Sequence, residues 1–349
     1  MKRITVSDIA KSLGVSKTLV SLVLNNKGNE NSISPDTQKK VWEKAKELNY
    51  KPNRIAQGLR TGKSNILGLI VADISNPFYA KIARYIEDAA DSFGYSLMIC
   101  SSDENEEKEK KLLHMLKERQ VDGLIISSTL SEHSEILQLK RENYPFVLID
   151  RYFPRIDSNY VGVDNYEGAC QAVEHLIQIG YRKIAHLTVS PSYITSLKDR
   201  SRGYRDSLKK HSIRYNKRID REIDFKNLRK ELQSVLTGLL SEPENVQALF
   251  VANNNLAVAC LESLNEMNLM IPRDIAVVSF DDIELFAHTY SPITAVSQPV
   301  EDICSITVKT LLEDIKAGGK MPKQQHILSP NLIVRHSCGR LSGRINYQQ

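Results

Sequence analysis

The sequence predicts a small all-α headpiece followed by an α/β region of two similar lobes, each a doubly wound parallel sheet. Two observations lead to this prediction. The first 63 of 349 residues show three short helical patterns and carry 13 Lys and Arg against 5 Asp and Glu, a net charge of +8. The rest carries 34 against 37, a net charge of −3, and there apolar runs of four to seven residues alternate with helical stretches.

The headpiece, residues 1–51, is predicted to fold as three helices. Thr5 to Asp8 resembles a capping box at the start of the first helix, and Ser16 follows a tight turn and caps the second. Ser34 and Pro35 supply a cap and a first-turn proline for the third. The inward residues of the third helix are expected to be Val41, Trp42, Ala45 and Leu48. Two helices joined by a three-residue turn and braced by a third form a helix-turn-helix arrangement.

The second helix places polar side chains on one outer arc. At about 100° per residue, an arc of roughly 140° holds Lys17, Thr18, Ser21, Leu22 and Asn25. Several of these side chains can donate hydrogen bonds to base edges or phosphates, and the positive charge of the headpiece favours a polyanionic partner. A merely solvated helix face is the alternative.

Residues 52–63 are predicted to be a linker, because the stretch NRIAQGLRTGKSN is too short and too polar to fold alone. From Ile66 onward, runs such as LGLIVA, GLIISS, FVLID and IAVVSF alternate with helical stretches, which is typical of βαβ units and of parallel sheets buried on both faces. The number of strands favours two lobes within residues 64–340. We assign 64–163 and 296–326 to the first lobe, and 164–293 and 327–340 to the second.

Polar side chains follow the predicted strands of both lobes. They occur at Asp73–Asn76, Ser127–Ser128, Asp150–Arg151, Asn253–Asn254 and Asp281–Asp282, with Phe78 and Tyr79 beside the first group. Ligands of open parallel sheets bind outside the carboxyl ends of the strands. Carboxylates, amides and a guanidinium around an aromatic face suit a polyhydroxylated ligand such as a sugar. The alternative is that each group only caps the helix that follows it.

Several classes of protein are excluded by what the sequence lacks. No apolar run is long enough for a signal peptide or a membrane span, and the five scattered cysteines lack the spacing of a disulfide framework or a zinc site. The stretch GLRTGKS has three residues between its glycines rather than four and precedes a strand, so it does not match a phosphate-binding loop. The eight histidines show no metal-ligand spacing, and no G-x-S-x-G elbow is present. We therefore expect a cytoplasmic protein that is not an enzyme and needs no cofactor or metal.

Longer motifs carry a family resemblance. They include ITVSDIAKSLGVSKTLVSLVLNNKG, NRIAQGLRTGKSNILGLIVADISNPFYA, VDGLII, RSRGY, FVANNNLAVACLESL, VVSFDDIE and LIVRHSCG. In this order, from about Arg3 to Gly339, the sequence resembles the lactose-repressor (LacI/GalR) family of dimeric bacterial transcription regulators. The resemblance implies a helix-turn-helix headpiece joined to a two-lobe sensor similar to periplasmic sugar-binding proteins.

The resemblance also implies roles for individual residues in DNA binding. Lys17 and Thr18 would read bases in the major groove, and Leu22 would hold the third reading position. Backbone or edge contacts to DNA are implied for Thr5, Ser16, Ser21 and Asn25. The segment from Asn53 to Leu59 resembles a hinge helix that folds on operator DNA, with Leu59 wedged into the minor groove and Ala56 packed beside it.

In the sensor, the positions that match family effector contacts are Asn76, Phe78, Asp150, Arg200, Asn253, Asn254 and Asp281.

Three features depart from the family pattern. Leu22 stands where arginine is common, which replaces a guanine contact by an apolar one. The loop from Lys27 to Ser34 looks a few residues longer than usual, and Asn254 stands where an aspartate is usual.

These observations lead to one hypothesis and two alternatives. We expect a repressor-type regulator of carbohydrate genes that binds double-stranded operator DNA as a homodimer and responds to a sugar or sugar phosphate between its lobes. The alternatives are a solute-binding protein without DNA function and a sugar-processing enzyme on the same two-lobe frame.

Overall fold

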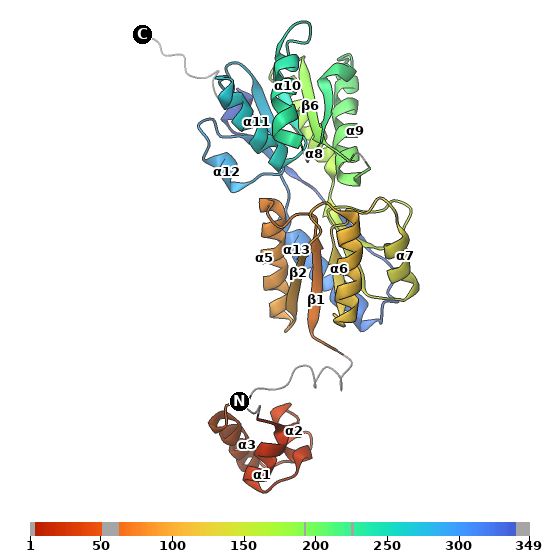
Figure 1. Ribbon diagram of the computed structural model, residues 1–349, viewed down its shortest axis with the longest axis vertical. Helices are drawn as coiled ribbons and strands as arrows, with labels where there is room; N and C mark the ends of the chain where they lie inside the picture. Colours follow the sequence, from red (N-terminus) through yellow and green to blue (C-terminus); the bar gives the residue numbers. More distant parts are fainter. Residues whose placement is uncertain (1–3, 51–62, 192, 225–226, 340–349) are drawn as a thin grey trace. The chain divides into compact units, whose positions relative to one another are not determined.

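The computed structural model describes residues 4–50, 63–191, 193–224 and 227–339 (Figure 1). The chain divides into two compact units, residues 1–64 and residues 65–349. The predicted linker residues 52–62, with Asn53, Ala56 and Leu59, lie outside the described residues.

The first unit contains three helices, α1 (Val6–Leu13), α2 (Lys17–Leu24) and α3 (Pro35–Glu47). Its core is small and contiguous and consists of Ile9, Ala10, Val20, Val23, Val41 and Ala45, all buried. The predicted caps of α2 and α3 are present, since the Ser16 and Ser34 hydroxyls accept hydrogen bonds from Leu19 N and Thr37 N. α1 and α2 with their short turn therefore form the expected helix-turn-helix, and α3 packs against both.

The prediction that Trp42 points inward is wrong. Val41 and Ala45 of α3 are buried, whereas the Trp42 side chain is 46% exposed. Residues 41, 45 and 48 form one stripe of a helix with 3.6 residues per turn, and residue 42 lies about 100° away from that stripe. The apolar character of tryptophan suggested burial, but the helical period decided its position.

The first lobe of the second unit is a six-stranded sheet with the order β11-β5-β4-β3-β1-β2. Its strands are β1 (Ile66–Val71), β2 (Ser96–Ser101), β3 (Gly123–Ile126), β4 (Phe146–Ile149), β5 (Asn159–Val163) and β11 (Gln325–Leu328), and all of them pair in parallel. Both faces are covered (Figure 1), one by α5 (Pro77–Ser92) and α13 (Val300–Lys316), the other by α6 (Glu106–Glu118) and α7 (Ser134–Arg141).

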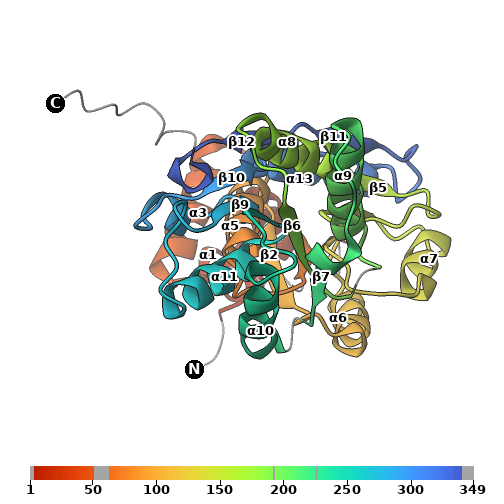
Figure 2. The same ribbon diagram turned by 90° about the horizontal axis from the view of Figure 1, so that it is seen from above.

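The second lobe repeats this plan with the order β12-β10-β9-β8-β6-β7. Its strands are β6 (Ile184–Val189), β7 (Asp220–Ile223), β8 (Ala248–Val251), β9 (Ala276–Phe280), β10 (Thr294–Ser297) and β12 (Asn331–Ile333), of which only β12 is antiparallel to its neighbour. One face carries α8 (Asn165–Gln178) and α9 (Thr195–Lys210), the other α10 (Leu228–Leu240) and α11 (Asn254–Glu266). The short segments η1 (Lys217–Ile219), α12 (Glu284–Ala287) and η3 (His336–Cys338) complete it. Figure 2 shows the helices on both faces from above.

The chain passes between the lobes three times: after β5, between β10 and α13, and between β11 and β12. The predicted lobe boundaries differ from these passages at two places. Val296 and Ser297 belong to β10 of the second sheet, and Ile327 and Leu328 belong to β11 of the first sheet. Strand pairing fixes these positions, and the short runs TAVS and QHIL carried too weak a signal to show it from sequence.

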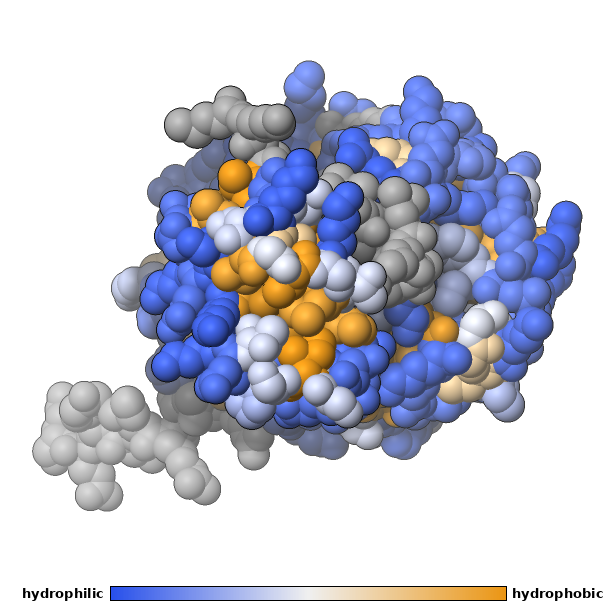
Figure 3. All heavy atoms as spheres, turned by 90° about the horizontal axis from the view of Figure 1, so that it is seen from below, coloured by the Kyte–Doolittle hydropathy of each residue, from blue (hydrophilic) through white to orange (hydrophobic). Residues whose placement is uncertain are grey.

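The sheets are buried on both faces, as the apolar runs predicted. Successive residues of β1 alternate between two apolar clusters: Leu67, Leu69 and Val71 face α5 and α13, and Ile70 faces α6. Most of the face drawn in Figure 3 is hydrophilic, and its largest apolar area lies near the centre. Within the described ranges, no helix is long and apolar enough to cross a membrane.

Candidate functional site

The start of α2 carries the exposed polar groups of the headpiece. Lys17 and Thr18, the first two residues of the helix, are exposed, and so is the capping residue Ser16. Ser16 Oγ accepts a hydrogen bond from Leu19 N at 3.1 Å, so its hydroxyl caps the N-terminus of α2. Thr5 is exposed as well, and its backbone N–H and hydroxyl both donate to Asp8 Oδ2, at 2.8 and 2.7 Å.

The remaining predicted DNA contacts in α2 and at its C-terminal cap are less accessible. Ser21, Leu22 and Asn25 are half-buried. α2 ends at Leu24, and the Asn25 side chain folds back to donate to Ser21 O at 2.6 Å and Ser21 Oγ at 3.4 Å. The outer arc is therefore most accessible in the first turn of the helix, where Lys17 and Thr18 lie.

A polar cavity lies between the lobes of the second unit, at the carboxyl ends of strands from both sheets. It contains about 570 Å³ of space, part of it open to solvent. From the first lobe it is lined by Asp73, Asn76, Phe78, Tyr79, Glu104, Asp150 and Arg151. From the second lobe it is lined by Val189, Ser190, Ile194, Ser196, Leu197, Arg200, Asn253, Asn255 and Asp281.

Two aspartates occupy corresponding positions in the two lobes. Asp150 directly follows β4 and Asp281 directly follows β9, the equivalent strand of the second sheet. Both adopt a left-handed backbone conformation, with φ of 63° and 68°. A non-glycine residue in this region is uncommon, and such strain concentrates at functional sites. The conformation places a buried carboxylate on each side of the cavity.

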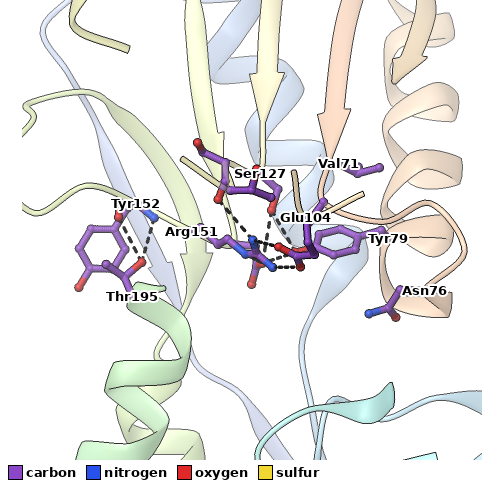
Figure 4. Close-up of polar contacts among 12 residues, drawn as sticks. Val71, Asn76, Tyr79, Glu104, Ser127, Arg151, Tyr152 and Thr195 are labelled. Carbon is purple, nitrogen blue, oxygen red and sulfur yellow. Dashed lines mark hydrogen bonds and ion pairs between the residues drawn. The ribbon is translucent and has the colours of Figure 1, made fainter. Parts of the chain in front are cut away.

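On the first-lobe side, Asp150 accepts a hydrogen bond from the Tyr79 hydroxyl at 2.8 Å. Burial raises the pKa of Asp150, although the charge of Arg151 opposes the shift. Arg151 binds Glu104 with both terminal nitrogens, at 2.9 and 2.6 Å, and its Nε lies 3.6 Å from Asp150 Oδ2. Figure 4 shows Arg151 reaching the Glu104 carboxylate next to the Tyr79 ring. The result is a connected network of two carboxylates, one guanidinium and one phenol.

On the second-lobe side, Arg200 is held on all sides. Its Nε donates to Asn165 Oδ1 at 2.8 Å, and one terminal nitrogen donates to Ala252 O at 2.7 Å and to Asp281 Oδ2 at 3.1 Å. The guanidinium stacks on the Phe280 ring at 3.7 Å. Asp281 also accepts from Gln298 Nε2 at 2.6 Å, which fixes the carboxylate at the cavity wall.

Hydrogen bonds join the lobes on either side of the cavity. Asn76 and Asn254 form a reciprocal amide pair, with N···O distances of 2.7 and 3.3 Å, and both side chains are buried. On the other side, Thr195 Oγ1 accepts from Tyr152 N and donates to Tyr152 O, each at 3.1 Å (Figure 4). Tyr193 of the second lobe donates to Thr129 O of the first at 2.9 Å.

The structure brings six of the seven sequence-predicted effector residues to the cavity wall: Asn76, Phe78, Asp150, Arg200, Asn253 and Asp281. Asn254 does not line the cavity, because its amide pairs with Asn76 and its neighbours Asn253 and Asn255 line the wall instead. The predicted rim residue Asp282 also points elsewhere and binds Arg335 with both oxygens, at 2.8 and 2.9 Å.

Sequence reasoning missed several lining residues, among them Glu104, Ser190, Ser196 and Asn255. A signal existed for Ser196, which lies one helical turn before Arg200 on α9 and therefore on the same helix face. Glu104 lies a few residues after the end of β2, so the rule on strand ends would have pointed to this segment.

Comparison with known proteins agrees with this arrangement. Residues 5–53 match the model of the bacterial regulatory proteins of the lacI family, and residues 173–338 match the periplasmic binding protein-like domain. The ribose operon repressor of Halalkalibacterium halodurans is 34% identical over 336 residues, which cover 95% of this chain and 96% of the relative. This chain belongs to the lacI family of bacterial regulatory proteins. Another relative, the HTH-type transcriptional regulator DegA of Bacillus subtilis, is 31% identical over 97% of this chain and 99% of its own.

Solved structures of transcription regulators match over nearly the whole chain. The Lac repressor dimer bound to operator and the anti-inducer ONPF matches with a TM-score of 0.84 and 26% identity, covering 97% of this chain and 99% of that one. The CelR–cellobiose complex matches with a TM-score of 0.70 and 27% identity over 96% and 100%.

The family assignment decides between the hypotheses drawn from the sequence. The chain is a DNA-binding transcriptional regulator with an effector-binding domain, and not an enzyme. The family model also covers the headpiece, which excludes a solute-binding protein without DNA function. Within the described ranges, no group of three or more His, Cys, Asp or Glu side chains could hold a metal ion.

Proposed function

We propose that this protein is a homodimeric, sugar-responsive repressor that binds operator DNA through the first turn of α2 and through the hinge segment 53–59. The observation that supports this proposal is the polar cavity at matching strand ends of both lobes. A ligand bound there contacts both lobes at once and can therefore change the angle between them. A transcription regulator acts on the chromosome, so we place the protein in the bacterial cytoplasm.

On the DNA side, we assign base reading to Lys17 and Thr18 and an apolar contact, such as one to a thymine methyl, to Leu22. Thr5, Ser16, Ser21 and Asn25 are assigned to phosphates and edges, and Asn53, Ala56 and Leu59 to the minor groove. Lys17→Ala should weaken binding of the full-length protein to its operator at least tenfold, as measured by fluorescence anisotropy. Lys209→Ala, which removes an exposed lysine from α9, is the charge-matched control. Equal losses in both variants would contradict the assignment.

On the partner side, we assign the dimer contact to an apolar groove formed by the start of α5 and by α10, α11 and α12. Its apolar wall includes Val258, Ile283 and Leu285, of which Leu285 is 52% exposed. Arg229 and Glu262 lie at the same groove, with a guanidinium nitrogen 3.1 Å from a carboxylate oxygen. A two-fold axis would let Arg229 of one copy pair with Glu262 of the other, and the reverse. Leu285→Asp should yield a monomer in light scattering. Ile327→Asp, which changes another exposed apolar residue on the first lobe, should not. A dimeric Leu285→Asp protein would refute the assignment.

On the effector side, we assign sugar binding to the cavity and the response to a change in the angle between the lobes. Asp281→Ala should weaken sugar binding without changing the affinity for operator in the absence of effector. Asp282→Ala removes the adjacent carboxylate, which binds Arg335 and does not line the cavity, and should leave sugar affinity unchanged. Undiminished sugar affinity in Asp281→Ala, measured by calorimetry, would contradict the proposal.

A further inference from the structure

The charges that line the cavity are unbalanced. Four carboxylates (Asp73, Glu104, Asp150 and Asp281) face two guanidiniums (Arg151 and Arg200). With every group ionised, the net charge of these six side chains is −2, and with Asp150 protonated it is still −1. A ligand that carries a phosphate or carboxylate would therefore enter a site of its own sign, in surroundings that screen charge weakly.

Both guanidiniums are already bound to carboxylates. The two terminal nitrogens of Arg151 donate to the two carboxylate oxygens of Glu104, at 2.9 and 2.6 Å. Arginine recognises phosphate with the same two-bond geometry. One terminal nitrogen of Arg200 donates to both Asp281 Oδ2, at 3.1 Å, and Ala252 O. Its Nε donates to Asn165, and Phe280 packs against the face of the guanidinium. An anionic ligand would have to displace a carboxylate from an arginine before it could bind there.

The groups that remain suit a ligand with many hydroxyls and no charge. An ionised carboxylate has about four acceptor positions, and Asp150 uses one oxygen for Tyr79 while Asp281 is bound by Arg200 and Gln298. The other carboxylate acceptors can take hydroxyl donors. Ser190 and Asn255 line the opposite wall and can both donate to and accept from a hydroxyl.

We propose that the effector is an uncharged polyhydroxylated molecule, and that Glu104 is a specificity residue that excludes phosphorylated and acidic sugars by occupying Arg151. This inference rests on the proposed function of the cavity and narrows it. Glu104 follows β2 and Arg151 follows β4, so the exclusion is built from two strand ends of the first lobe.

The test is calorimetric titration of the full-length protein with matched sets of ligands. Each set holds a neutral sugar, its phosphate ester and its aldonic acid, for example ribose, ribose 5-phosphate and ribonate, or glucose, glucose 6-phosphate and gluconate; neutral disaccharides extend the panel. We expect a neutral member to bind and its anionic counterparts to bind at least tenfold more weakly. An anionic member that binds as tightly as its neutral counterpart overturns the inference, and so does a panel in which no neutral sugar binds.

A variant tests the role of Glu104 itself. Glu104→Gln keeps the shape but removes one negative charge and frees Arg151, so the affinity ratio of anionic to neutral ligand should rise about tenfold. Asp103→Asn is the matched control, because Asp103 lies one residue earlier, is exposed, bonds to Lys108 and does not line the cavity. An unchanged ratio in Glu104→Gln, or an equal rise in both variants, overturns the assignment.

The two proposals fail in different ways. If an anionic sugar binds, if Asp281→Ala weakens that binding and if the ligand alters operator affinity, the inference about charge falls and the proposed function stands. If Asp281→Ala leaves binding of every ligand unchanged, the cavity is not the effector site and both fall.

Discussion

The amide pair between Asn76 and Asn254 gives the sharpest prediction about how the lobes are held together. Asn254→Ala removes hydrogen bonds of 2.7 and 3.3 Å that join residues on different lobes. Each hydrogen bond contributes a net of about 0.5–1.5 kcal/mol, so the pair contributes about 1–3 kcal/mol. When the lobes separate, both amides are free to bind water, so the loss falls on the closed arrangement alone.

That free energy converts into a measurable change in effector binding. About 1.4 kcal/mol corresponds to a factor of ten, so the equilibrium between closed and open lobes should shift roughly 5- to 150-fold toward open. Because a ligand that needs the closed arrangement binds more weakly as that arrangement becomes less populated, the apparent Kd should rise by up to this factor. Calorimetric titration of the parent and variant proteins with the same sugar measures it.

A matched control separates the effect on closure from a general effect on folding. Asn227→Ala also removes an amide, but the Asn227 amide bonds to Asp224 within the same lobe. The control should retain the effector affinity of the parent protein, and both variants should keep the parent circular-dichroism spectrum. A change of less than twofold in Asn254→Ala would refute the idea that the pair holds the lobes closed.

Three further predictions concern stability and DNA binding. Burial raises the pKa of Asp150, so its ionised form lowers the stability of the folded protein at neutral pH. Asp150→Asn should therefore raise the melting temperature by a few degrees while it weakens sugar binding. A lower melting temperature would contradict this prediction. Burial alone would raise the pKa of Asp220, but hydrogen bonds from His186, Tyr215 and Arg205 lower it well below its usual value. Its contribution to stability is therefore present above pH of about 4, the unfolded value, and is lost as pH falls toward the lowered pKa of the folded state. Asp220→Asn should flatten this acid-side loss in thermal melts at pH 2–4, and a profile parallel to that of the parent protein would count against the prediction. Leu59→Ser should lower operator affinity in anisotropy assays with unchanged sugar affinity, and equal operator affinity would remove the minor-groove assignment.

Much of the fold was predictable because its signals are local. Caps at Ser16 and Ser34 and short apolar runs such as LGLIVA depend on residues close in sequence, and these elements are present where they were expected. The strand-end rule located Asp150 and Asp281, because parallel strands bring their carboxyl ends to one edge of the sheet. Both residues line the cavity.

The parts that sequence reasoning missed depend on contacts between distant residues. Asn254 pairs with a residue 178 positions away on the other lobe, so no local pattern shows that its side chain leaves the cavity. The short strands β10 and β11 acquire their lobes only through pairing with β9 and β5. Hydrophobicity alone misplaced Trp42, although the helical period of α3 already indicated the correct side.

The three passages of the chain between the lobes limit how the sensor can move. A single connecting segment would let the lobes move apart or rotate freely about it. Three connecting segments hinder sliding of one lobe over the other and leave bending as the easiest motion. The free energy of ligand binding therefore drives one defined bending motion of the lobes rather than several independent motions. It also follows that a single proteolytic cut at any one passage leaves two covalent links, so a nicked sensor should stay in one piece.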